Sequence, residues 1–118
     1  MNHFRPGQPI ECLSIEIELE KEKVRAPDGT VVEKVGFKIG GGIDQDPQRS
    51  PFKYPDTGIY ITWVENGSPA ELVGLKQHDK ILGVNGYDFT MVTHERAVKC
   101  IKRNPKLKML IARREVAI

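Results

Sequence analysis

The chain has 118 residues, a formal net charge of +2 at pH 7 and 39% hydrophobic residues. This length is enough for one domain with a single core, and it is too short for a core plus a separate catalytic lobe. Because the basic residues form no dense stripe with interleaved aromatic residues, we expect no nucleic-acid partner. We predict a single domain over residues 1–118, with its core at about 11–114 between short flexible tails.

The cysteines and the apolar runs indicate the compartment. Cys12 and Cys100 are far apart and neither belongs to a C-x-x-C pair, which is not the pattern of a disulfide framework. No apolar run approaches the roughly 20 residues of a membrane span, and the first residues, MNHFRPGQP, do not form a signal peptide. We therefore expect a cytoplasmic protein with reduced thiols and no membrane insertion.

The first predicted elements are a strand and a charged turn. Apolar and polar residues alternate from Leu13 to Leu19, which predicts a half-buried strand at 13–19. The charged stretch EKEKVRAPDGT follows it, and the sequence Pro27-Asp28-Gly29 predicts a turn within that stretch.

Two further strands are predicted on either side of a long loop. The first covers about 35–40 and places three apolar side chains on one face: Val35, Phe37 and Ile39. Residues 41–57 are rich in Gly, Pro and Asp, which is typical of a surface loop. The sequence GIYITWV predicts a strand at 58–64, with Ile59, Ile61 and Trp63 inward and Tyr60 and Thr62 outward.

The second half of the chain predicts two short helices and three strands. NGSPAELVGL contains a helix that is capped by Ser68 and ends at Gly74. DKILGVNGYDF predicts a hairpin that turns at Asn85-Gly86. A second helix begins at Thr93 and stops before an Asn-Pro pair, and LKMLIAR predicts a last strand at 107–113.

The glycine-rich stretch VGFKIGGGIDQDP, residues 35–47, does not match the common anion or cation loops. Gly36 and Gly41 have the spacing of a phosphate-binding loop, but Gly42 and Ile43 follow where Lys and Ser/Thr are needed. No G-x-G-x-x-G sequence opens a helix. A calcium loop starting at Asp44 lacks the required Gly and Glu at its sixth and twelfth positions. The glycines therefore serve another ligand, or none.

Four parts of the chain together resemble a PDZ domain. They are Val35-Gly36-Phe37, the segment SPA with a following GL at 68–75, DKILGVNG at 79–86, and His94 at the start of the second predicted helix. The sequences IGGGIDQDP, GIYIT and TMVTHERA narrow the resemblance to the Tax-interacting protein family, which consists of one PDZ domain and almost nothing else. The resemblance implies an α+β, mostly β fold, in which a six-stranded, partly open antiparallel barrel or sandwich is capped by two α-helices.

The resemblance also implies a binding site. An extended peptide would add to the strand at about 35–40, beside the second helix, and its C-terminal carboxylate would bind the N–H groups of Val35, Gly36 and Phe37. Gly36 permits the backbone turn that aims these groups at one point. The family usually has a small residue where this chain has Lys34. The charge of Lys34 could assist the carboxylate, while its bulk puts the shape of the loop in question.

Side-chain pockets would give this site its specificity, because the side chains of an added strand alternate in direction. We expect an apolar cup for the ligand's last residue, lined by Val35, Phe37, Ile39, Val98 and Ile101, although all of these are also ordinary core residues. By resemblance, His94 binds a Ser or Thr hydroxyl on the ligand's third residue from the end, whereas a lone helical His is otherwise more often a surface residue. Lys38 and Thr62 are either contacts for the next residue upstream or solvated strand positions.

The long loop resembles the family's wall against upstream ligand residues. Pro51, with Phe52 nearby, could pack on an aromatic side chain about five residues before the ligand's end. The alternative is a surface loop that only connects two strands.

Together these residues predict a module that captures C-terminal peptides of the form Ser/Thr, any residue, then an apolar residue. The resemblance implies a single-valence competitor or adaptor in Wnt/β-catenin and Rho type signalling, without a cofactor or metal. The family's partners include β-catenin, rhotekin, glutaminase and inward-rectifier potassium channels. The nucleus and the periphery of the plasma membrane are implied as further locations beside the cytoplasm.

A small hydrolase with a Cys or Ser nucleophile is the alternative function. Cys100 and His94 are the available pair, but six residues on one helix separate them by roughly 240°, so they would point apart. We therefore expect no enzyme. We also expect a monomer, because the chain's own end, EVAI at 115–118, has no hydroxyl at the third position from the end. Insertion of this tail into a neighbour's site is expected only at high concentration.

Overall fold

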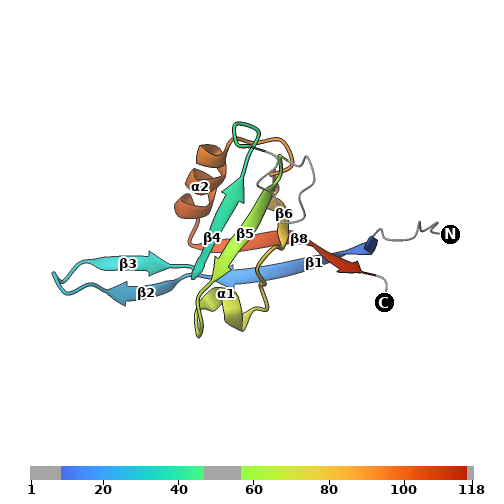
Figure 1. Ribbon diagram of the computed structural model, residues 1–118. Coiled ribbons are helices and arrows are strands. Elements are labelled where there is room, and N and C mark those ends of the chain that lie inside the picture. The colour runs from blue at the N-terminus through green and yellow to red at the C-terminus, as the bar shows by residue number, and fades with distance from the viewer. Residues whose placement is uncertain (1–8, 47–56, 117–118) are drawn as a thin grey trace.

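The computed structural model of the chain describes residues 9–46 and 57–116 (Figure 1). In chain order, the strands and helices are β1 Pro9–Glu20, β2 Glu22–Arg25, β3 Val31–Lys34, β4 Phe37–Gly41, β5 Ile59–Val64, α1 Pro69–Leu72, β6 Lys80–Val84, β7 Tyr87–Asp88, α2 His94–Arg103 and β8 Lys106–Val116. No helix among these elements is long and apolar enough to cross a membrane.

Six of the strands form one antiparallel sheet. Its order is β1-β8-β6-β5-β4, and β7 pairs with β6. Within the described residues β1 and β4 end this order without pairing with each other, so the sheet is not closed. The mostly β fold with six sheet strands and two helices that the sequence predicted is therefore confirmed. The core is formed mainly by apolar side chains of this sheet and of α2, with Ala70 of α1, Leu75 and Phe89; its members include Leu19, Ile59, Ile61, Ile81, Ala97, Leu107 and Ile111, all 0% exposed.

The outer pair of strands is longer than the sequence predicted. β1 and β8 pair along their whole length, from Pro9 opposite Val116 to Glu20 opposite Lys106. The predicted end of the last strand at Arg113 was wrong, because the residues before Leu13 provide backbone partners for the chain beyond it. A long antiparallel pair of this kind is stabilised by its own hydrogen-bond ladder as well as by the core.

The charged stretch after β1 forms a separate two-stranded hairpin, which the sequence predicted only as a turn. β2 and β3 pair so that Glu22 lies opposite Lys34 and Lys23 lies opposite Glu33. Opposite charges across a strand pair favour this register. The predicted turn is confirmed, since Asp28 Oδ1 accepts hydrogen bonds from the N–H and hydroxyl of Thr30. The hairpin projects from the body of the domain (Figure 1).

Trp63 on β5 corrects the predicted strand pattern. Ile59 and Ile61 are buried as expected, but Trp63 is 46% exposed. Lys38 pairs with Trp63 whereas Ile39 pairs with Ile61, so β5 has one extra residue, Thr62, at this point. Such a bulge reverses the alternation of side chains beyond it. A period-two pattern cannot reveal a bulge, which is why the sequence placed the indole inward.

The predicted helix ends and the tight hairpin are confirmed. Ser68 caps α1 by accepting the N–H of Glu71 at 3.3 Å, and Gly74 follows the helix with φ +91°. Thr93 caps α2 by accepting the N–H of Arg96 at 3.2 Å. The turn between β6 and β7 has two positive φ angles, 51° and 82°, at its Asn-Gly pair, as the tight hairpin turn requires.

Candidate functional site

The loop that enters β4 presents backbone N–H groups to the edge of the sheet. The carbonyl of Val35 accepts the N–H of Ala70 at 3.1 Å, and the carbonyl of Gly36 accepts the N–H of Glu65 at 2.8 Å. In a trans peptide the N–H points opposite to the carbonyl of the preceding residue. The N–H groups of Gly36 and Phe37 are therefore directed away from α1 and from Glu65, the residue after β5.

The pairing of β4 leads to the same orientation for Phe37. Phe37 lies opposite Val64, and the bond from Glu65 to Gly36 flanks this pair. The pair is therefore of the non-hydrogen-bonded kind, in which both N–H groups point away from the partner strand. In residues 9–46 and 57–116, β4 pairs with β5 alone, and its other edge lies beside α2 (Figure 1). The edge thus offers backbone donors and acceptors for one more strand.

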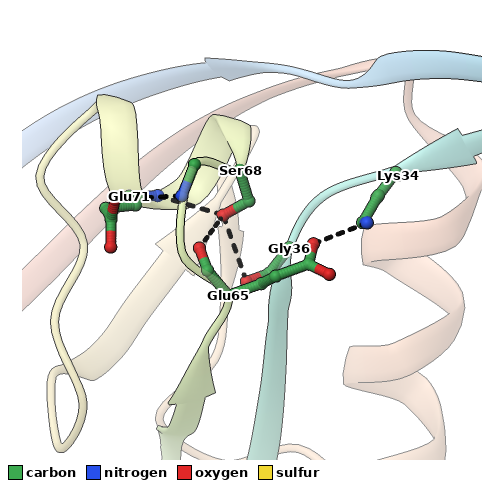
Figure 2. Close-up of polar contacts among 6 residues, drawn as sticks. Lys34, Gly36, Glu65, Ser68 and Glu71 are labelled. Atoms are coloured by element: carbon green, nitrogen blue, oxygen red, sulfur yellow. Dashed lines mark hydrogen bonds and ion pairs between the residues drawn. The ribbon is translucent and has the colours of Figure 1, made fainter.

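Gly36 is required by this loop for two separate reasons. Its φ is +86°, a conformation that side chains rarely adopt. A Cβ at this position would also overlap Cβ and Oγ of Ser68. Figure 2 shows the close approach, in which the Ser68 hydroxyl donates to the carbonyls of Glu65 at 2.7 Å and of Gly36 at 3.4 Å. The N-cap of α1 therefore fixes the shape of the loop.

Lys34, the departure from the family pattern, has an acidic partner. Its Nζ lies 2.7 Å from Oε2 of Glu65 (Figure 2). Both side chains are partly exposed, at 44% and 32%, so the pair contributes little to stability. The side chain of Lys34, at the end of β3, extends to Glu65. The loop after it keeps the orientation of the Gly36 and Phe37 N–H groups described above.

His94 is held at the other end of β4 by two hydrogen bonds. Its Nδ1 lies 2.9 Å from the carbonyl oxygen of Gly41, and its backbone N–H donates to Oδ1 of Asp44 at 3.0 Å. A carbonyl oxygen only accepts, so Nδ1 carries the hydrogen and Nε2 of the neutral ring has a free lone pair. The sequence placed His94 in the site but left this tautomer open.

The glycine run after β4 allows the chain to approach the start of α2. Gly41 and Gly42 have φ values of +86° and +128°. A Cβ on Gly42 would lie 2.5 Å from the backbone nitrogen of His94. The hydrogen bond from His94 holds the pKa of the Asp44 carboxyl below its ordinary value. Sequence reasoning considered Asp44 only as the start of a calcium loop and missed its contact with His94; its signal was an acidic residue two positions after the glycine run.

The other candidate residues lie on β4, β5 and α2 but differ in burial. Phe37 and Ile101 belong to the core at 8% and 6% exposure. The remaining apolar ones, Val35, Ile39 and Val98, are half-buried. Lys38 is exposed and Thr62 is half-buried. Pro51 and Phe52 lie outside the described residues, so their expected contact with a ligand stays a prediction.

The outer face of β4 and β5 has a pair that sequence reasoning missed. The ammonium of Lys38 lies 5.2 Å from the centre of the Trp63 ring. This distance is within the range of a cation–π interaction. The bulge at Thr62 turns Trp63 to the same face as Lys38, so the indole is available there together with the charge.

The comparisons with known proteins agree with this geometry. The PDZ domain family model matches residues 23–112. The chain belongs to the PDZ family. It is 63% identical over 111 residues to the Tax1-binding protein 3 homolog of Caenorhabditis elegans, covering 94% of this chain and 90% of that protein. It is 44% identical over 115 residues to human Tax1-binding protein 3, covering 95% and 89%.

A solved structure extends the likeness to three dimensions. The crystal structure of wild-type TIP-1 superposes with a TM-score of 0.72 at 42% sequence identity, covering 86% of this chain and 88% of that one. The resemblance to a PDZ domain and to the Tax1-binding protein 3 group that the sequence predicted is therefore confirmed. This PDZ domain is a protein-binding module.

Proposed function

We propose that this PDZ domain captures C-terminal peptides of the form Ser/Thr-x-apolar residue by strand addition between β4 and α2, without catalysis. The observation that carries the proposal is the orientation of the Gly36 and Phe37 N–H groups at the unpaired edge of β4. Two successive N–H groups directed to this edge can form a nest for an anion. A peptide added to that edge ends at this nest, so the anion is its terminal carboxylate.

His94 selects the ligand's third residue from the end. Because its Nδ1–H is bound by Gly41, Nε2 acts as an acceptor. A Ser or Thr hydroxyl on the ligand can donate to it, whereas a ligand carbonyl cannot. Asp44 is a positioning residue in this proposal, since it binds the backbone N–H of His94.

Apolar and upstream contacts complete the proposed site. The half-buried side chains of Val35, Ile39 and Val98, together with the buried Phe37 and Ile101, suit an apolar last residue. Lys38 and Trp63 lie on the outer face of β4 and β5, where alternate ligand side chains point. Acidic or aromatic residues at those ligand positions are therefore favoured, and Thr62 lies beside them on β5.

The proposed role in the cell is that of a single-valence competitor or adaptor. Its support is the likeness to the Tax1-binding protein 3 group over most of the chain. We propose partners of the kind that the family resemblance implied, with C-terminal tails such as those of β-catenin, rhotekin, glutaminase and inward-rectifier potassium channels. Wnt/β-catenin and Rho type pathways are the proposed setting, in the cytoplasm, the nucleus or at the plasma membrane, with the protein as a monomer.

Cys100, the best candidate nucleophile, gives no support to the hydrolase alternative. Burial raises the pKa of the Cys100 thiol, so the reactive thiolate is disfavoured at neutral pH. The Cys100 side chain contacts the amide of Asn104, while His94 binds Gly41. The two groups are engaged on different sides of α2, which supports a binding function.

The terminal carboxylate provides the direct test of the proposal. A peptide ending in Thr-x-Leu should bind with a Kd of about 1–100 μM. Amidation of its C-terminus should weaken binding at least about 30-fold, because charge-assisted hydrogen bonds to the loop are lost. Calorimetry with the acid and amide forms measures the difference. Equal affinities would refute the proposed site.

Replacement of His94 with alanine should affect ligands selectively. The loss should be about 1 kcal/mol for a Thr-containing peptide, the net value of one hydrogen bond. It should be close to zero for the same peptide with Val in place of Thr. Fluorescence polarisation with both peptides on both proteins measures the four affinities. A loss of equal size for the two peptides would mean that His94 supports the fold instead.

A further inference from the structure

A hollow lies on a face of α2 that does not carry His94. Its cavity volume is about 510 Å³, and it is bounded by β7, by α2 and by the segment that joins them. The floor is apolar and includes Phe89, which is 2% exposed, together with half-buried Val92 and Cys100. Cys100 is six residues from His94 on the helix, which places it on a different face from the peptide site. The proposed strand-addition site does not use this hollow.

Two guanidinium groups at the rim of the hollow have no acidic partner in the described part of the chain. Arg96 and Arg103 both line the hollow, and both are exposed. By contrast, the neighbouring Lys99 pairs with Glu95 at 3.1 Å. Asp88, the carboxylate at the rim, accepts the N–H and the hydroxyl of Thr90 at 2.8 and 2.6 Å. The hollow therefore combines an apolar floor with two unpaired cations.

The spacing of these cations suits one kind of ligand. Arg96 and Arg103 are seven residues apart, which is two turns or roughly 10 Å along α2. An amphipathic helix has the same spacing between its residues i and i+7, with i+3 and i+4 between them on the same face. Arginine binds carboxylates in bidentate fashion. Glutamates at the outer positions would reach the two arginines while a leucine between them enters the hollow.

We propose that this hollow docks an acidic amphipathic helix of a partner protein, with an apolar side chain on the Phe89 floor and carboxylates on Arg96 and Arg103. The carboxylate of Asp88 at the rim disfavours a polyanion such as RNA or an anionic membrane, which would present negative charge to the whole rim. The site is separate from the β4 edge. A single domain could then hold a C-terminal tail and an acidic helix at once, which goes beyond the proposed single-valence role.

The test uses a peptide without a free C-terminal carboxylate, so that it cannot occupy the proposed strand-addition site between β4 and α2. The peptide is helical, has about 18 residues, and is acetylated at its N-terminus and amidated at its C-terminus. It carries Glu at i and i+7 and Leu at i+3 and i+4. We titrate it into the isotope-labelled full chain and follow the chain's amide signals by NMR. The amide signals of Phe89, Val92 and Cys100 should shift, with a Kd below about 1 mM. A peptide with Gln in place of both Glu residues should bind at least about fivefold more weakly.

Matched variants separate this site from general charge effects. The double variant Arg96→Gln, Arg103→Gln should bind the acidic peptide at least about fivefold more weakly. Lys23→Gln with Arg25→Gln removes the same charge from the exposed β2–β3 hairpin and should leave its affinity unchanged. Both variants should bind the Thr-x-Leu peptide within about threefold of the parent chain, which shows that they are folded.

Four results would overturn the proposal. They are no binding of the acidic peptide up to about 2 mM, an unchanged affinity in the Arg96→Gln, Arg103→Gln variant, an equal loss in the hairpin variant, and shifts confined to residues outside the hollow. Vesicles of phosphatidylcholine and phosphatidylserine and a short RNA are tested in parallel. Binding of either one through these arginines, without binding of the peptide, would assign the hollow to a different ligand.

Discussion

Replacing Arg113 with methionine should lower the free energy of unfolding by about 3 kcal/mol, because it leaves a buried carboxylate without its cation. Asp79 is 2% exposed, and Arg113 binds both of its oxygens, at 2.8 and 2.7 Å. The same guanidinium donates to the carbonyl of Gly74 at 2.8 Å. The pKa of Arg113 is raised, chiefly by the hydrogen bond to Asp79. Urea unfolding followed by tryptophan fluorescence measures the loss.

Two further variants show whether the buried charge is the cause. Adding Asp79→Asn to the Arg113→Met chain removes the uncompensated charge and should recover about 1 kcal/mol or more. Lys108→Met, on the same strand, breaks an exposed pair with Glu18 at 3.7 Å and should cost less than about 0.5 kcal/mol. If Arg113→Met were as mild as Lys108→Met, the ion pair would not hold β8 to the loop before β6.

Features with a local cause could be predicted from the sequence. The caps at Ser68 and Thr93 and the turn at Asn85-Gly86 depend on residues a few positions apart, and the structure confirms all three. The PDZ fold was predicted because several such segments, taken together, resemble those of known members of the family. His94 was placed in the candidate site by the same resemblance and not by its own chemistry.

Features that depend on distant partners could not be predicted. The bond between Asp44 and His94 joins residues 50 positions apart, and the pair of Asp79 with Arg113 joins residues 34 apart. Trp63 was misplaced because one extra residue at Thr62 reverses the strand pattern. The sequence contains the donors and acceptors of these contacts, but only the folded chain determines which of them meet.

Gly36→Ala should weaken binding of a Thr-x-Leu peptide more than about 100-fold, since it disturbs both N–H groups that would hold the carboxylate. The alanine would have to adopt φ +86°, and its Cβ would overlap the side chain of Ser68. Because the Gly36 carbonyl binds Glu65 at 2.8 Å, a shift of this residue also moves the start of β4. Calorimetry measures the affinity, and circular dichroism shows whether the variant is folded.

Gly29→Ala is the matched control, because Gly29 has φ +90° but open space around its Cβ position. It should cost about 1 kcal/mol of stability from backbone strain alone and leave peptide binding unchanged. In the Gly36→Ala chain, Ser68→Gly removes the overlapping Cβ and Oγ while glycine remains an acceptable N-cap. This second change should restore part of the affinity, because it relieves the overlap but not the strained φ. A folded Gly36→Ala protein that binds as tightly as the parent chain would show that the carboxylate binds elsewhere.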